Sequence, residues 1–282
     1  MTEPGLLAAR ALSYTALLLA AGAPLYMLVA GRALVSGRRT LPAVAVLALI
    51  ALAASAWGMM ESVASMLAAP VGEVDRATLQ AILAETPLGL VFAVRGAALL
   101  LTAFAAARRQ CGLAAIAASI ALATNAWTGH VGATEGGFGT IHRLSDVAHL
   151  LAAAMWLGAL IIFLGALLGR SNRDALLRSL AGFAATGTIL VLLLTTGIVN
   201  MIVIAGWPPS LTSDWALVLM VKLGLFAAML GFAALNRWRL APALAADAPG
   251  SDRALRFSLA AETAAGLAVL LVVALLGTLS PT

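Results

Sequence analysis

Long apolar runs separated by short polar breaks fill the chain from end to end. Most runs are about 20 residues long, which is the length that a helix needs to cross about 30 Å of hydrocarbon. They show no alternation of period two, so the strands of an outer-membrane barrel are not expected. The breaks delimit eight predicted helices: Leu7–Ala30, Leu41–Ala69, Pro87–Ala107, Cys111–Trp127, Val147–Leu168, Leu180–Ala205, Trp215–Leu235 and Phe257–Leu279. The pattern predicts an all-α, polytopic membrane protein, a bundle of eight transmembrane helices in one domain over residues 1–282.

The composition excludes most soluble classes of protein. Hydrophobic residues make up 62% of the 282 residues, charged residues make up 10%, and the mean hydropathy is +1.03. An ordinary soluble domain carries about 25% charged residues. A cytosolic enzyme, a disordered chain and a secreted disulfide scaffold are therefore excluded, and the single cysteine, Cys111, permits no internal disulfide.

The positive charges alternate along the chain. Twelve of the 17 basic residues fall in the connections after the first, third, fifth and seventh predicted spans. By the positive-inside rule these connections lie in the cytoplasm, and both termini lie on the opposite, periplasmic side. The net charge of +5 thus reflects topology, and no nucleic-acid partner is expected. The second connection, residues 71–86, is expected to form a short amphipathic helix at the membrane surface.

The three histidines of the chain fall within one stretch of 20 residues. At 100° per residue, His142, Asp146 and His149 share one face of a helix. The Gly-rich stretch 131–141 lets His130 fold back toward them. Imidazole suits copper, zinc, nickel and haem iron, and an aspartate one turn away can ligate or orient a ring. The cluster indicates a metal or haem site at the outer mouth, whereas a lone interfacial histidine is more often just a polar residue at the boundary.

Methionines provide a second signal. Met59, Met60 and Met66 lie in the outer half of the second predicted span, and Met201 lies near the outer end of the sixth. Thioethers are soft ligands that select Cu(I). Packing is the alternative interpretation, because methionine on an apolar helix usually fills space in a core.

Polar residues inside the predicted spans provide a third signal: Glu61, Arg95, Asn200, Lys222 and Glu262. A charge at the bilayer centre costs about 3 kcal/mol on insertion scales, so such residues face partners or water. We expect Glu61 and Arg95, in the outer halves of adjacent spans, to form an ion pair. Lys222 and Glu262 lie at different depths and are not expected to touch. A polar permeation route is the alternative.

Common motifs of nucleotide-binding proteins and hydrolases are missing from the sequence. It contains no Walker A loop, no GxSxG and no HExxH. We therefore expect no catalytic residues and no enzymatic activity, unless the histidines hold haem in an oxidoreductase.

The stretch Asp146–Leu160, DVAHLLAAAMWLGAL, resembles a transmembrane segment of the copper resistance protein D family (CopD/PcoD). Trp127–His130 is similar to the Gly-His element of that family, and Val221–Gly224 with Asn236–Arg237 and Glu262 is similar to its C-terminal pattern. The resemblance is best over about residues 120–282 and loose over the first four spans.

This resemblance implies copper transport across the bacterial inner membrane, inward from the periplasm, in copper homeostasis and resistance. The cargo would be Cu(I) or Cu(II), and the partner a separate periplasmic copper-binding protein of the CopC type. Carried over, His130, His142 and His149 would be copper-binding positions at the periplasmic face. Two alternatives stay open: a membrane redox protein of the cytochrome b type that binds haem b, and a copper sensor or assembly factor without transport. The oligomeric state is left open.

Overall fold

The computed structural model describes residues 4–30, 37–132, 136–169, 173–206 and 213–280. Over these residues, seven helical segments are long and apolar enough to cross a membrane. They contain α1 (Pro4–Ala30), α2 (Gly37–Met66), α4 (Pro87–Ala107), α7 (Gly136–Leu168), α9 (Thr188–Ala205), α10 (Asp214–Leu235) and α12 (Ser251–Leu276). The all-α membrane fold is confirmed, and seven of the eight predicted spans are long spans. The remaining one is the fourth predicted span, Cys111–Trp127. It is a shorter apolar segment made of α5 (Cys111–Ala123) and the 3₁₀ turn η2 (Thr124–Trp127).

Shorter elements connect the spans: η1 (Val71–Glu73), α3 (Arg76–Glu85), α6 (Gly129–Gly132), α8 (Arg173–Thr186), the π-helical turn η3 (Asn236–Leu240) and α11 (Ala241–Ala245). The short helix expected within residues 71–86 is α3. Asp75 caps it by accepting hydrogen bonds from the backbone N–H of Thr78 at 2.9 Å and from its hydroxyl at 2.6 Å. These bonds lower the pKa of Asp75.

The prediction of one unbroken sixth span, Leu180–Ala205, is wrong. Gly187 has a φ of +55°, in the left-handed region that ends a helix and that glycine adopts without a Cβ clash. Residues before it belong to α8, and only Thr188–Ala205 forms the span α9. The fifth span also differs, because α7 begins at Gly136 rather than Val147. His142 and Asp146 therefore lie within a continuous helix.

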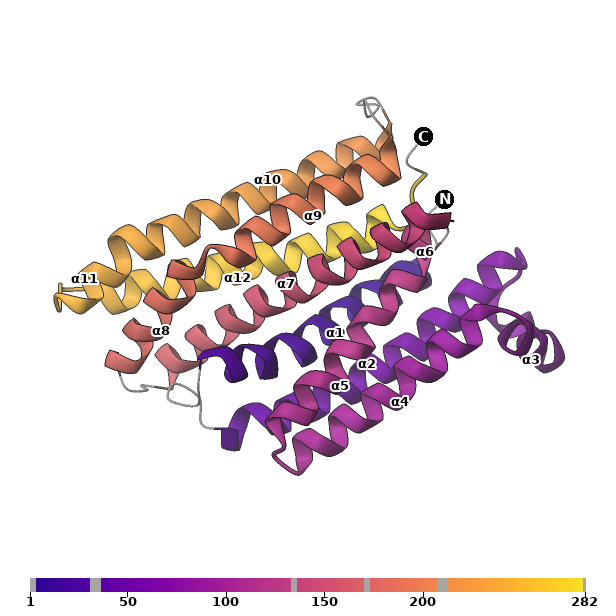
Figure 1. The fold of residues 1–282 in the computed structure, drawn as a ribbon, viewed down its shortest axis with the longest axis horizontal. Helices are drawn as coiled ribbons and strands as arrows, with labels where there is room; N and C mark the ends of the chain where they lie inside the picture. The colour runs from indigo at the N-terminus through magenta and orange to yellow at the C-terminus, as the bar shows by residue number, and fades with distance from the viewer. Residues whose placement is uncertain (1–3, 31–36, 133–135, 170–172, 207–212, 281–282) are drawn as a thin grey trace.

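Helix α1 joins two groups of helices. It packs against α2, α5, α7 and α12. Figure 1 shows α2, α4 and α5 gathered on one side of it, and α9, α10 and α12 on the other. The contact between α1 and α7 is very close: a Cβ added to Gly158 would lie 2.2 Å from the backbone carbon of Gly22. Small residues let two membrane helices approach in this way.

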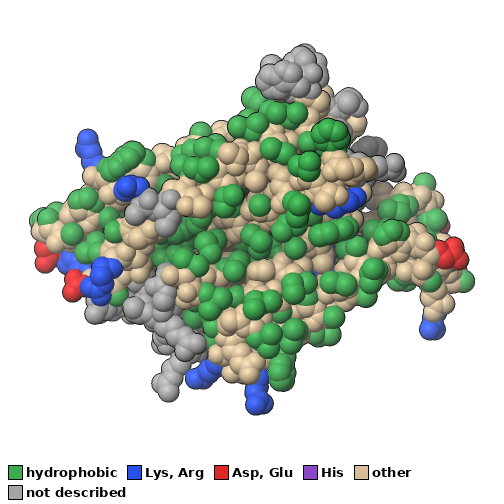
Figure 2. Space-filling view, viewed as in Figure 1, with side chains coloured by type: hydrophobic (Ala, Val, Ile, Leu, Met, Phe, Trp, Pro, Cys, Tyr) green, Lys and Arg blue, Asp and Glu red, His purple; other side chains and the backbone are tan. Residues whose placement is uncertain are grey.

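The two ends of the bundle differ in charge. The turn after α4, helix α8, the π turn η3 and α11 lie at one end and carry many arginines, which Figure 2 shows as blue side chains beside a largely hydrophobic face. We call it the arginine-rich end. The beginning of α1 and the end of α12 meet at the opposite end, where Arg10 donates a hydrogen bond to the Gly277 carbonyl. We call this the terminal end.

Candidate functional site

Polar side chains from three helices meet in the half of the bundle toward the terminal end. Asn200 Nδ2 donates to Asp146 Oδ1 at 3.0 Å, and His149 Nδ1 lies 3.0 Å from Thr196 Oγ1. Asp146 and His149 are three residues apart on α7, and Thr196 and Asn200 are four apart on α9, so each pair shares a helix face. Lys222 on α10 lies close enough for its charge to act on Asp146 and His149. We call these five residues the His149 site.

The hydrogen bonds around Thr196 assign the tautomer of His149. The Thr196 hydroxyl has one proton, which it donates to the Leu192 carbonyl. Toward His149 the hydroxyl oxygen is therefore an acceptor, and Nδ1 of the ring carries the proton. A neutral imidazole then keeps a lone pair on Nε2, which is the form that coordinates a metal ion.

One acceptor at the same site has no partner among the described residues. Asn200 Oδ1 is buried, and it has no hydrogen bond within the part of the chain that the structure describes. Buried polar atoms are usually paired, so an unpaired carbonyl oxygen beside a carboxylate marks a place suited to a cation. His149, Asp146 and Asn200 offer nitrogen and oxygen donors, which are ligand types that suit divalent copper.

Tyr14 on α1 connects this site with the buried Arg95 on α4. Tyr14 lies within range of the charges of Arg95 and Asp146. Arg95 is only 5% exposed; its Nε donates to Thr124 Oγ1 at 2.7 Å, and its guanidinium lies 5.0 Å from the centre of the Phe92 ring. Of the two cations, Lys222 acts on the Asp146 carboxylate, whereas Arg95 acts on Tyr14.

The predicted ion pair between Glu61 and Arg95 is wrong. No ion pair joins them among the side chains that the structure describes. Glu61 instead accepts a hydrogen bond from Trp57 Nε1 on its own helix at 2.8 Å. It also packs against Gly5, where an added Cβ would lie 2.3 Å from Glu61 Oε1. Glu61 and Arg95 each form a hydrogen bond with another residue instead.

The three predicted histidine ligands are only partly placed. His142 is fully buried on α7, seven residues and about 10 Å along the helix from His149. His130 belongs to α6, and its side chain lies outside the described part. Within the described residues, no group of three or more His, Cys, Asp and Glu side chains is close enough to hold a metal ion. The convergence of the three histidines stays a prediction.

The predicted methionine ligands lie elsewhere in the described structure. Met59, Met60 and Met66 are on α2, which packs mainly on α1 and α4, and Met66 is 64% exposed. Met201 packs with Trp215 and other residues of a small apolar cluster at the terminal end. Their role as Cu(I) ligands stays a prediction.

A second polar group lies toward the arginine-rich end, and we call it the Glu262 site. Trp156 Nε1 donates to Glu262 Oε1 at 2.8 Å, and Asn236 Nδ2 donates to Glu262 Oε2 at 2.9 Å. These residues come from α7, the turn η3 and α12, and all three line a cavity of about 920 Å³. Glu262 and Lys222 belong to different sites, as predicted from the different depths of the two residues in their membrane spans.

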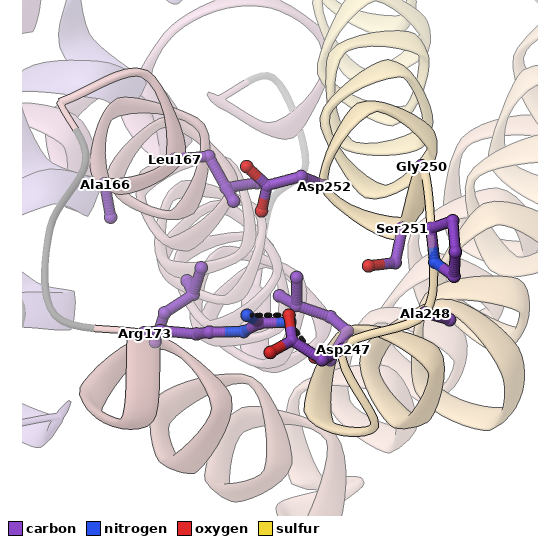
Figure 3. Close-up of a pocket in the computed structure, with 11 residues that line it drawn as sticks. Ala166, Leu167, Arg173, Asp247, Ala248, Gly250, Ser251 and Asp252 are labelled. Atoms are coloured by element: carbon purple, nitrogen blue, oxygen red, sulfur yellow. Dashed lines mark hydrogen bonds and ion pairs between the residues drawn. The ribbon is translucent and has the colours of Figure 1, made fainter.

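A smaller hollow of about 490 Å³ lies at the arginine-rich end, between α7, α8 and the turn from α11 to α12. Figure 3 shows Arg173 reaching across it to Asp247, with Asp252 and Ser251 on the α12 side. Arg173 Nη1 lies 2.5 Å from Asp247 Oδ1, and its other terminal nitrogen donates to the Leu244 carbonyl. This ion pair ties α8 to α11 across the hollow.

Sequence reasoning missed the partners that complete these sites. It considered Lys222 only in relation to Glu262 and did not predict that Lys222 lies near Asp146. Asn236 entered only through the family resemblance. A usable signal existed for α9, because Thr196 and Asn200 are polar residues four apart in an otherwise apolar helix.

Comparison with known proteins extends the resemblance over both halves. The N-terminal domain profile of copper resistance protein D-like proteins matches residues 1–140, where the spans alone gave only a loose match, and the copper resistance protein D profile matches residues 177–276. Copper resistance protein D of Pseudomonas syringae pv. tomato is 34% identical over 218 residues, 70% of each chain. Inner membrane protein YebZ of Escherichia coli (strain K12) is 32% identical over 160 residues, 55% of each chain. No solved structure matches the chain.

These matches and the seven long apolar helices agree with each other. The chain belongs to the copper resistance protein D family and is a multi-pass inner membrane protein.

Proposed function

We propose that this protein carries copper ions across the inner membrane and takes them up at the terminal end, which faces the periplasm. The arginine-rich end would then face the cytoplasm, in keeping with the positive-inside rule. Family membership supports copper as the cargo. The observation that carries the proposal is the His149 site, where an imidazole, a carboxylate and an amide oxygen without a hydrogen-bond partner among the described residues meet inside an apolar bundle.

In this proposal copper moves along the α7 face. His130 and His142 receive the ion nearer the terminal end, and Asp146 and His149 accept it about 6 Å and about 10 Å farther along α7 from His142. Lys222 keeps the Asp146 charge compensated while the site is empty, and an arriving cation displaces the Lys222 ammonium from it. Copper therefore exchanges with the Lys222 ammonium at this site. It can bind there and leave again, as a transport site requires. A periplasmic copper-binding protein of the CopC type is the proposed donor.

The test is copper accumulation by cells that produce the His149→Ala variant, normalised to the amount of protein in the membrane. We expect uptake to fall to the level of cells without the protein, because the variant loses the only ring nitrogen at the site. Leu150→Ala, which changes the neighbouring residue on α7 without removing a ligand, serves as the control. Uptake equal to wild type in His149→Ala would exclude His149 from the route.

Two further measurements separate the alternative functions. A haem protein of the cytochrome b type would show a Soret band that His149→Ala abolishes. A sensor or assembly factor would bind copper but give no copper flux in proteoliposomes. Flux measured with Cu(I) and with Cu(II) also identifies the form that is carried.

A further inference from the structure

The cavity beside Glu262 lies between two pairs of helices. Helix α9 packs on α7 and α10 packs on α12, and the cavity of about 920 Å³ lies among these helices and α8, in the half toward the arginine-rich end. Its walls are mainly apolar, with Leu160, Leu190 and Leu230 among them. Trp238, which also lines it, is exposed, so the cavity is open to the outside of the bundle. A membrane lipid can therefore enter it from the side.

The polar atoms in this cavity require a hydrogen-bond donor. Asn236 is 6% exposed, and its Oδ1 has no hydrogen-bond partner among the described residues. Glu262 is 2% exposed, and it accepts hydrogen bonds from two neutral groups, Trp156 Nε1 and Asn236 Nδ2. No described Lys or Arg forms an ion pair with it. A buried carboxylate without a cation, next to an unpaired acceptor, is costly unless a donor fills the space.

Aromatic rings and an arginine complete the cavity. Trp156, Phe163 and Phe183 line it, with ring centres 6.4 Å apart for Trp156 and Phe183 and 5.9 Å apart for Phe163 and Phe183. Aromatic faces attract an ammonium group, which a carboxylate also binds. Arg237 lines the same cavity, and a guanidinium is well suited to phosphate. The cavity thus presents one group for each charge of a zwitterionic lipid headgroup.

We propose that this cavity binds an aminophospholipid of the phosphatidylethanolamine type. Its ammonium donates to Glu262 and to Asn236 Oδ1, its phosphate meets Arg237, and an acyl chain follows the apolar wall. The requirement is for N–H donors as well as for charge. Phosphatidylcholine has the same charges but no N–H, and phosphatidylglycerol has no cation.

The experiment is native mass spectrometry of the purified full-length chain in detergent, with equal amounts of the ethanolamine, choline and glycerol lipids of identical acyl chains. We expect the ethanolamine lipid to be retained about tenfold better than either of the others, since a hydrogen bond to a buried charged group is worth about that factor. Equal retention of the three lipids overturns the proposal. Co-purification of a quinone in place of phospholipid overturns it as well.

Variants locate the preference in the cavity. Glu262→Gln removes the charge without changing the shape, and Asn236→Leu removes the acceptor, so each is expected to abolish the preference for the ethanolamine lipid. Glu61→Gln is the matched control, because Glu61 also accepts from a tryptophan Nε1 but lies on α2, outside the cavity. A preference that persists in both cavity variants, or that Glu61→Gln also loses, contradicts the assignment. The wild-type lipid series decides the proposal even if a variant fails to fold.

Discussion

The His149 site and the Glu262 site share α7 and the long helix that begins as α10, yet they handle charge in opposite ways. The His149 site combines a carboxylate with Lys222 and contains an amide oxygen, Asn200 Oδ1, that has no hydrogen-bond partner among the described residues. The Glu262 site surrounds one carboxylate with neutral donors and places it beside a cavity. One site carries its own cation, and in the other no described Lys or Arg forms an ion pair with the carboxylate.

This difference indicates what each site can exchange. At the His149 site the charge of Asp146 is compensated from within the bundle, so an incoming cation has to compete with Lys222 and can leave again. At the Glu262 site, compensation has to come from a molecule that enters the cavity. Helix α9 completes the first site and α12 the second, so the two can be altered separately.

The largest expected effect comes from the contact that positions α7. Gly158→Leu places a side chain where even a Cβ would lie 2.2 Å from the Gly22 backbone, so α1 and α7 must separate. Overpacking of this kind costs about 3 kcal/mol or more, and both sites should be lost together. The measurement is the amount of monodisperse protein that survives a heating series in detergent, followed by size-exclusion chromatography.

Gly165→Leu is the matched control for that experiment. Gly165 lies on the same helix, but an added Cβ there meets nothing within 4 Å. We expect it to behave like wild type. Equal losses in the two variants would show that the close crossing of α1 and α7 is not what holds α7 in place.

The same carboxyl-to-amide change can be made in each of the two sites. Asp146→Asn removes the negative charge that attracts copper and should weaken copper uptake about 100-fold, as expected when a buried charge loses its partner. Glu262→Gln should reduce uptake much less, because its carboxylate belongs to the other site. Uptake as a function of copper concentration measures both. A loss in Glu262→Gln as large as in Asp146→Asn would mean that the two sites form one route.

A double variant separates binding from folding in this comparison. Asp146→Asn leaves the Lys222 charge without its partner, which by itself destabilises the bundle. Asp146→Asn combined with Lys222→Met removes both charges and should recover stability but not uptake. Recovery of uptake in the double variant would show that Asp146 only balances Lys222.

The sequence was sufficient for the bundle because each span satisfies its own backbone hydrogen bonds, so length and hydropathy define it. The sequence was not sufficient to predict helix breaks that depend on the local backbone conformation. The break between α8 and α9 depends on the positive φ of Gly187 inside a continuous apolar run. Nothing in hydropathy marks such a position.

The site was predicted for residues on one helix and missed between helices. Asp146 and His149 were found because periodicity places them on one face of α7. Their partners Asn200 and Lys222 lie on α9 and α10, and their approach depends on how those helices rotate and pack. The wrong pairing of Glu61 with Arg95 has the same origin, because sequence gives depth in the membrane but not the direction in which a side chain points.

The smallest expected effect concerns the hydroxyl that orients His149. Thr196→Val keeps the shape of the side chain but removes the acceptor for Nδ1–H, so the ring is free to turn and to place its proton on Nε2. Partners of this kind are worth about tenfold in metal affinity. We therefore expect the copper concentration for half-maximal uptake to rise by about that factor, with the maximal rate nearly unchanged. Thr196→Ser keeps the hydroxyl and should restore the wild-type value, whereas a role in packing alone would leave serine as poor as or poorer than valine.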